Sequence, residues 1–215
     1  SAQTIISELD SAIFITEQAI GSFHPKYANA IELKAQVLIQ LEQYDVALKL
    51  LKEADSIYVE SYGKNHIKTA NNAVLVADLY YSKKEYDQAE VYYRDAMGTF
   101  KKIFNDQHPK YTATLSKLGK NYYAAGDIKK ATKTFDQTTS IYLEYINLYF
   151  PSLTENQKSK YWNKIRTDFE IFNSLAVSNH EENPKLLAKM YEYKLATKAL
   201  LLSSSIKIKE QIAAS

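Results

Sequence analysis

The stretch His24-Pro25-Lys26-Tyr27-Ala28 returns in altered form at two later places in the chain. Its counterparts are His66-Ile67-Lys68-Thr69-Ala70 and His108-Pro109-Lys110-Tyr111-Thr112. Each of the last two histidines follows the one before it by the same offset, from position 24 to 66 and from 66 to 108, and we call this offset the repeat period. A fixed offset of this length is the signature of a repeat protein, in which each repeat is one small structural unit.

The same offset aligns small residues with small ones and large residues with large ones. The small sets are Ala35, Ala77 and Gly119, and Ala47, Ala89 and Ala131; the large sets are Leu38, Tyr80 and Tyr122, and Leu51, Tyr93 and Phe135. This register gives repeats at about residues 23–64, 65–106 and 107–149. Residues 1–22 align with the second half of a repeat, so we expect the sequence to be a fragment of a longer chain.

Each repeat predicts two helices. The first helix opens at the His-Pro step, where proline suits the first helical turn, and runs to about Gln40, Ser82 or Ala125. A short polar break follows, and the second helix then carries apolar residues at three-to-four spacing. One such hairpin is too small to bury its apolar face, so neighbouring hairpins must stack. The predicted fold class is therefore all-α, a right-handed α-solenoid of stacked antiparallel helical hairpins over residues 1–150.

The register breaks at Phe150-Pro151. Thr154 and Gln157 have the spacing of a capping box that opens a helix running towards Asn179. Asn183 and Pro184 then predict the start of a final helix that reaches about Ile212. We expect residues 151–215 to form one long helical hairpin that extends or caps the solenoid.

The pattern of small residues resembles that of the tetratricopeptide repeats, as do the Tyr-Asp-x-Ala steps at residues 44–47 and 86–89. The long repeat period, with His-Pro before the first helix, resembles the longer repeats of kinesin light chains. The resemblance implies a protein that binds a peptide or a partner domain on a concave face lined by the first helix of each hairpin.

A second resemblance concerns the C-terminal region. The segments FPSLTENQKSKYW at 150–162, DFEIFNSLAV at 168–177 and YEYKLATKALLLSS at 191–204 resemble the region between tetratricopeptide repeats and a caspase-like CHAT peptidase domain in large bacterial proteins. Such a peptidase uses a histidine and a cysteine, and this sequence contains no cysteine. No catalytic residue carries over, and the resemblance implies the sensor or regulatory part of such a protein.

The register locates the residues expected on the concave face. They are Asn29, Glu32, Gln36, Ile39, Asn71, Val74, Asp78, Tyr81, Ala113, Ser116, Lys120 and Tyr123. A mostly polar set with two aromatic rings suits an extended or helical peptide. The alternative is a solvated inner surface that the chain's own C-terminal helix covers. Glu32 and Gln36 occupy the places where some family members use basic and amide residues to bind a C-terminal carboxylate, so we do not expect that type of site.

Other chemistry finds little support in the sequence. The three repeat histidines lie two helix widths apart in a stack and cannot share a metal ion, so we expect them to form turns or caps. The chain has no glycine-rich phosphate loop, and we expect no cofactor. No Gly-x-Ser-x-Gly elbow surrounds Ser203-Ser204-Ser205, so we do not expect a catalytic nucleophile there. Lys and Arg number 27 and Asp and Glu 25, with both signs interspersed, which disfavours nucleic acid as a partner. No long apolar run predicts a membrane span, and the lack of cysteine leaves the compartment open, with the cytoplasm favoured over export.

The sequence therefore favours a non-catalytic protein-interaction scaffold, the regulatory fragment of a larger CHAT-type peptidase protein. One alternative is an architectural module that self-associates through exposed solenoid ends to give a homo-oligomer. Another is an enzyme with an unrecognised site in residues 150–215.

Overall fold

The computed structural model describes residues 2–181 and 183–198. The chain divides into two compact units, which we call unit 1 (Ser1–Gly126) and unit 2 (Asp127–Ser215). Within the described residues every regular element is helical, so the predicted all-α solenoid class is confirmed.

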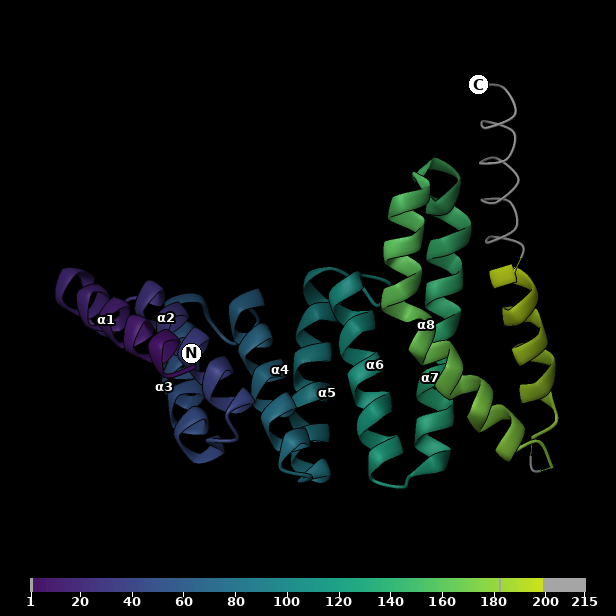
Figure 1. Ribbon diagram of the computed structural model, residues 1–215, viewed down its shortest axis with the longest axis horizontal. Helices are drawn as coiled ribbons and strands as arrows, with labels where there is room; N and C mark the ends of the chain where they lie inside the picture. The colour runs from purple at the N-terminus through teal and green to yellow at the C-terminus, as the bar shows by residue number, and fades with distance from the viewer. Residues whose placement is uncertain (1, 182, 199–215) are drawn as a thin grey trace. The chain divides into compact units, whose positions relative to one another are not determined.

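Unit 1 consists of helices that follow one another from α1 to α6 (Figure 1). Their bounds are α1 Ala2–Ile20, α2 Pro25–Gln40, α3 Tyr44–Tyr62, α4 Ile67–Ser82, α5 Tyr86–Ile103 and α6 Pro109–Ala124. We call α2, α4 and α6 the first helices, and α1, α3 and α5 the second helices. The first helices begin and end close to the positions that the repeat register predicts.

The repeat histidines are helix caps, as predicted. The Nδ1 atoms of His24, His66 and His108 accept a hydrogen bond from the backbone N–H two residues later, at 3.1, 3.2 and 3.2 Å. This bond satisfies one of the N–H groups that a helix start leaves without a partner. Two of the rings also stack on an aromatic residue that precedes them, Tyr62 on His66 at 4.3 Å and Phe104 on His108 at 3.9 Å between ring centroids.

A residue with left-handed backbone follows each first helix. Glu42, Lys84 and Gly126 occupy equivalent places in successive repeats, and their φ angles are 60°, 63° and 79°. Left-handed backbone of this kind is easy for glycine and strained for other residues. The residue at this place therefore has a left-handed φ in each repeat, although only Gly126 adopts it without strain.

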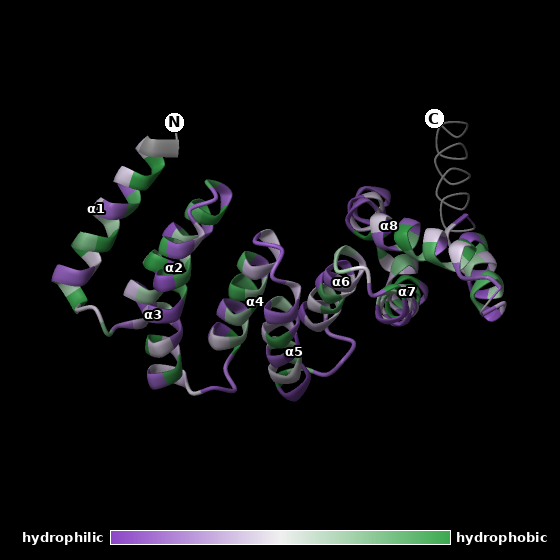
Figure 2. Cartoon of the chain, turned by 90° about the horizontal axis from the view of Figure 1, so that it is seen from below, coloured by the Kyte–Doolittle hydropathy of each residue, from purple (hydrophilic) through white to green (hydrophobic). Residues whose placement is uncertain are grey.

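Small residues hold the hairpins of unit 1 together. Ala35, Ala47, Ala54, Ala77 and Ala89 have no exposed surface at all. Their short side chains let neighbouring helices approach closely, while larger residues fill the spaces between. Figure 2 shows that the helices of unit 1 carry both hydrophobic and hydrophilic residues.

Unit 2 contains α7 (Ile128–Tyr149), a short 3-10 helix η1 (Phe150–Ser152), α8 (Glu155–Ser178) and a helical segment over residues 185–198. The capping box of Thr154 and Gln157 is present, as predicted, and opens α8. Tyr193 joins these parts: its ring lies 5.9 Å from Phe169 and 5.2 Å from Phe172, and its hydroxyl lies 3.1 Å from Asp136 on α7.

The compact units divide at a different place from the predicted domains. Unit 1 ends at Gly126, so α6 and α7, the two helices of the third predicted repeat at 107–149, fall in different units. The division into 1–150 and 151–215 stays a prediction. The pairing of α6 with α7 in one hairpin also stays a prediction. The predicted end of the last helix near Ile212 lies outside the described residues. In the part of the chain that the structure describes, no helix combines the length and the apolar character needed to cross a membrane.

Candidate binding site on the first helices

The predicted binding residues of unit 1 lie on α2, α4 and α6, and we call the surface that they share the first-helix face. Tyr81 and Tyr123 are its most exposed large side chains, with 37% and 47% of their surface accessible. Asn29 is exposed as well. Gln36, Ile39, Asn71, Val74, Ala113 and Lys120 are half-buried, as are Glu32 and Asp78. Ser116 is buried, so its side chain is not available to a partner.

Two lysines bridge the first helices of successive repeats. The Nζ atom of Lys68 on α4 donates to Oδ1 of Asn29 on α2, at 2.8 Å. The Nζ atom of Lys110 on α6 donates to Oδ1 of Asn71 on α4, at 2.9 Å. The two donors are one repeat period apart, and so are the two acceptors, so the same bond forms twice.

Each bridging lysine also lies over an aromatic ring of the preceding second helix. Lys68 is 6.0 Å from the ring centroid of Tyr58, and Lys110 is 5.8 Å from that of Phe100. Ammonium groups are attracted to the face of such a ring at this distance. We call Asn29, Tyr58 and Lys68 the first junction, and Asn71, Phe100 and Lys110 the second junction.

The carboxylates of the first-helix face are also engaged within the chain. The hydroxyl of Tyr58 donates to Oε2 of Glu32 at 3.0 Å, and that of Tyr93 donates to Oδ1 of Asp78 at 2.7 Å. Lys117 pairs with the other oxygen of Asp78. Burial raises the pKa of Glu32, which outweighs the lowering effects of the Tyr58 hydrogen bond and of Lys68.

The first-helix face therefore has two parts with different roles. Asn29, Asn71 and Asp78 bond to lysines of the following repeat, whereas Glu32 bonds to Tyr58 of its own repeat. Tyr81 and Tyr123, near the C-terminal ends of α4 and α6, are aromatic and accessible. Because they are one repeat period apart, they occupy equivalent places on neighbouring first helices.

Lys68 and Lys110 were not among the sequence-predicted site residues, although both lie in the repeated stretch next to the capping histidines. A lysine on a helix surface is usually solvated. Only the repeat register indicated that Lys68 and Lys110 share a role.

The structure also adds a recess of about 600 Å³ between α3, α4 and α5. It is lined by charged and small residues that include Asp55, Asp95 and Gly98.

The comparison with protein families identifies the chain. The profile of the tetratricopeptide repeat matches residues 26–102 and again 76–144, which together cover more than half of the 215 residues. The chain belongs to the tetratricopeptide-repeat family. No curated protein sequence matches it.

Solved structures agree with this family and with the longer type of repeat. BtubC (BKLC) from P. vanneervenii is similar with a TM-score of 0.68 at 17% identity, over 92% of this chain and 74% of that one. A putative kinesin light chain of Podosopora anserina with nearly identical TPR-like repeats gives a TM-score of 0.66 at 17% identity, over 91% and 88%. A Rap protein complexed with Competence and Sporulation Factor gives 0.57 at 16% identity, over 98% and 61%. At these identities the likeness shows the fold alone.

The family and the fold define the class of function. This tetratricopeptide-repeat chain is a protein–protein interaction scaffold, and proteins are its partners.

Proposed function

We propose that the first-helix face is the concave binding surface of this scaffold, and that it holds an extended or helical peptide segment of a partner protein. Tyr81 and Tyr123 carry the proposal, because they place two accessible rings at equivalent positions of successive repeats. Tyrosine gives large contact area with little loss of conformational freedom, and it is enriched at protein interfaces. The engaged polar groups on the same face would fix the surface before the partner arrives, which lowers the entropic cost of binding.

A screen of immobilised peptides against the purified chain tests this proposal. Peptides selected by the wild-type chain should bind the double variant Tyr81→Ala/Tyr123→Ala at least tenfold more weakly, since each lost ring removes a central apolar contact. Tyr191→Ala is the matched control, because Tyr191 is exposed and lies in unit 2. If the double variant binds the selected peptides as tightly as the control does, the partner uses another surface.

We further propose that this scaffold is the regulatory part of a CHAT-type peptidase protein. The segments at 150–162, 168–177 and 191–204 support this proposal through their resemblance to the region that precedes such a domain. Sequencing the gene beyond the codon for Ser215 tests it. A domain with a His/Cys pair is the expected result, and any other domain contradicts the proposal.

Self-association through α1 is a second candidate function. Ile5 and Ile15 of α1 are 49% and 64% exposed, whereas their equivalents in α3, Ala47 and Ile57, are buried. An apolar stripe without cover is a surface on which another copy could stack. Light scattering over a range of concentrations should then show a growing mass, which Ile15→Glu abolishes; a constant mass contradicts this function.

A further inference from the structure

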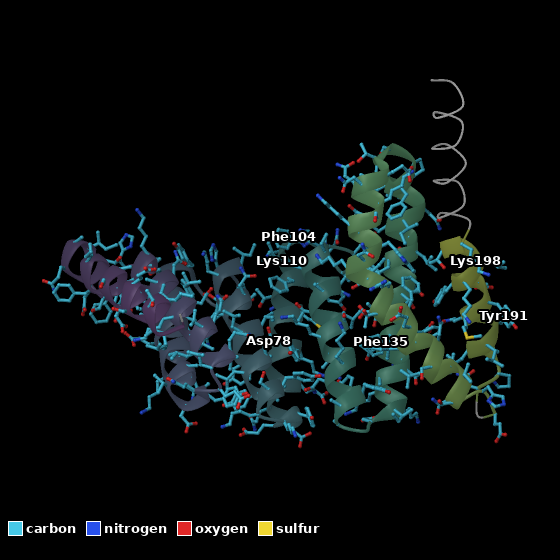
Figure 3. All side chains as sticks on the ribbon, in the orientation of Figure 1. Asp78, Phe104, Lys110, Phe135, Tyr191 and Lys198 are labelled. Carbon is cyan, nitrogen blue, oxygen red and sulfur yellow. The ribbon has the colours of Figure 1, made fainter. Side chains whose placement is uncertain are left out.

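The recess between the second helices α3 and α5 and the first helix α4 has the size of a ligand pocket. It measures about 600 Å³, and pockets for small molecules measure about 300–1,000 Å³. In Figure 3 the recess lies along the stretch of α4 and α5 between the labelled residues Asp78 and Phe104. Its lining comes from unit 1 alone, so the recess belongs to one compact unit.

Two carboxylates line the recess from opposite sides, Asp55 on α3 and Asp95 on α5. Among the described residues, Asp55 accepts a 3.4 Å hydrogen bond from the Asn72 amide and forms no ion pair, and the Asp95 side chain forms neither. Burial raises the pKa of the half-buried Asp55, and the nearby Asp95 charge adds to this rise, whereas Asn72 and Lys64 oppose it. The two negative charges are therefore close enough to repel each other, and a cation between them would remove that repulsion.

Thr99 presents a polar atom to the same recess. It lines the recess with only 6% of its surface exposed. The other buried threonines of the described residues each donate their hydroxyl to a backbone carbonyl, at 2.7 to 3.3 Å. Within the same part of the chain the Thr99 hydroxyl has no partner, although its oxygen is not sealed from the recess. This hydroxyl is therefore available to a ligand.

Gly98 leaves space on the α5 wall of the recess. It lies inside α5, where glycine is less favourable than alanine because it loses more conformational freedom on folding. A Cβ atom at this place would meet no neighbouring atom within 4 Å, so packing against the described residues does not require glycine. A longer side chain would reach into the recess that Gly98 lines.

The rim of the recess is basic. Lys52, Lys64, Arg94 and Lys102 all line it and are exposed. Arg94 donates to Glu90 and Tyr122, and Lys102 donates to Asn65 at 3.3 Å. A ligand that carries only positive charge would be repelled by this rim, whereas a ligand with charges of both signs would suit both the rim and the two carboxylates.

We propose that the recess binds a small dipolar molecule, whose primary ammonium group lies among Asp55, Asp95 and Thr99 and whose anionic group lies towards the basic rim. An ammonium group has three donors, and two carboxylates and a hydroxyl oxygen supply three acceptors. Hydrogen bonds between charged groups are the stronger kind. The site is additional to the proposed peptide surface on the first helices and does not depend on it.

A titration of the ¹⁵N-labelled chain with 6-aminohexanoate, followed by nuclear magnetic resonance, tests the site. The probe should shift the backbone amide signals of Gly98 and Thr99, and hexanoate, which lacks the ammonium group, should bind at least about tenfold more weakly. Equal affinity for the two probes would overturn the proposal. N-acetyl-lysine amide represents the lysine side chain of a partner protein, and tighter binding of that probe would overturn the assignment to a dipolar small molecule.

Variants of the three acceptors identify the ammonium position. Asp55→Asn and Asp95→Asn keep the shape of each side chain and should each weaken 6-aminohexanoate about tenfold or more. Thr99→Val should weaken it about fivefold. Glu60→Gln is the matched control, because Glu60 is exposed on α3 outside the recess, and it should leave the affinity unchanged. Wild-type affinity in both asparagine variants would overturn the proposal.

Gly98→Leu tests the recess without a loss of stability. Leucine replaces a glycine inside a helix and meets open space, so the melting temperature followed by circular dichroism should not fall. The same side chain should fill the recess and abolish the shift of the Thr99 amide signal. A folded Gly98→Leu chain that binds 6-aminohexanoate as tightly as the wild type would show that the ligand does not enter the recess, and the proposal would fail.

Discussion

Unit 1 and unit 2 are held together in different ways. In unit 1 the same contacts recur once in each repeat period: buried alanines inside the hairpins, histidine caps at the first helices and Lys–Asn bonds between repeats. In unit 2 the packing converges on Tyr193, which contacts Phe169 and Phe172 and reaches Asp136. We infer that the stability of unit 1 is a sum of small equivalent contributions, whereas that of unit 2 depends on the contacts of one residue.

The largest effect is expected at that residue. Tyr193→Ala should destabilise unit 2 by about 3–5 kcal/mol, because it leaves a cavity beside two rings and removes the hydroxyl from Asp136 and Ser140. Trp162 is the one tryptophan of the chain, so its fluorescence in a urea titration reports on unit 2. Tyr191→Ala, two residues away at an exposed position, should change stability by less than about 0.5 kcal/mol. Similar losses for both variants would refute the inference that unit 2 depends on Tyr193.

Unit 1 should respond with smaller and matching losses at equivalent positions. Ala47→Leu and Ala89→Leu each introduce a large side chain at a fully buried site and should each cost about 1–3 kcal/mol. Thermal unfolding followed by circular dichroism gives both values. The neighbouring change Val46→Leu, at an exposed position, is the control. The equivalence of the repeats fails if one of the two alanine variants unfolds the chain and the other is neutral.

Loss of a histidine cap should have a more modest effect. His66→Ala and His108→Ala should each cost about 1 kcal/mol, since the backbone N–H of Lys68 or Lys110 loses its acceptor. His66→Asn and His108→Asn should retain most of the stability, because asparagine also caps helices well. Urea unfolding measures the four variants. An asparagine variant as unstable as its alanine counterpart would show that the stacked ring, rather than the cap, provides the stabilisation.

The smallest expected effect is a pH dependence that comes from Glu32, which accepts a hydrogen bond from Tyr58 of the first junction. Burial raises the pKa of Glu32, so the folded state binds this proton more tightly than the unfolded state does. Glu32 therefore favours folding at low pH, and its contribution to stability falls as pH rises from the usual glutamate pKa through the raised value. The difference in unfolding free energy between wild type and Glu32→Gln, measured over this range, should show that decline. A difference that does not change with pH would contradict it, and Val74→Gln, at the equivalent place of the next repeat, should show no decline.

Local interactions explain which parts of this architecture could be predicted from the sequence. A histidine followed by Pro25 or Pro109 caps and starts a helix through atoms two residues apart, so the starts of α2 and α6 follow directly from the repeated stretch. The first-helix face was also accessible to prediction, because the positions that share a helix face follow from helical periodicity.

The hydrogen-bond partners and the burial of the side chains on that face could not be predicted in the same way. Lys110 and Asn71 are far apart in the sequence, and their bond depends on how two helices are placed rather than on either segment alone. The same holds for the burial of Ser116 and for the division between the units after Gly126. Sequence periodicity gives the direction of a side chain, whereas its partner depends on packing.

The left-handed turn residues Glu42, Lys84 and Gly126 have a consequence for how such a scaffold changes its length. Each of them follows a first helix and has a left-handed φ, even where the residue is Glu or Lys. A duplicated segment of one full period would therefore bring its own left-handed turn residue at the equivalent place. The chain is in this sense extensible, and a longer surface for partners can arise by copying one period without remodelling the others.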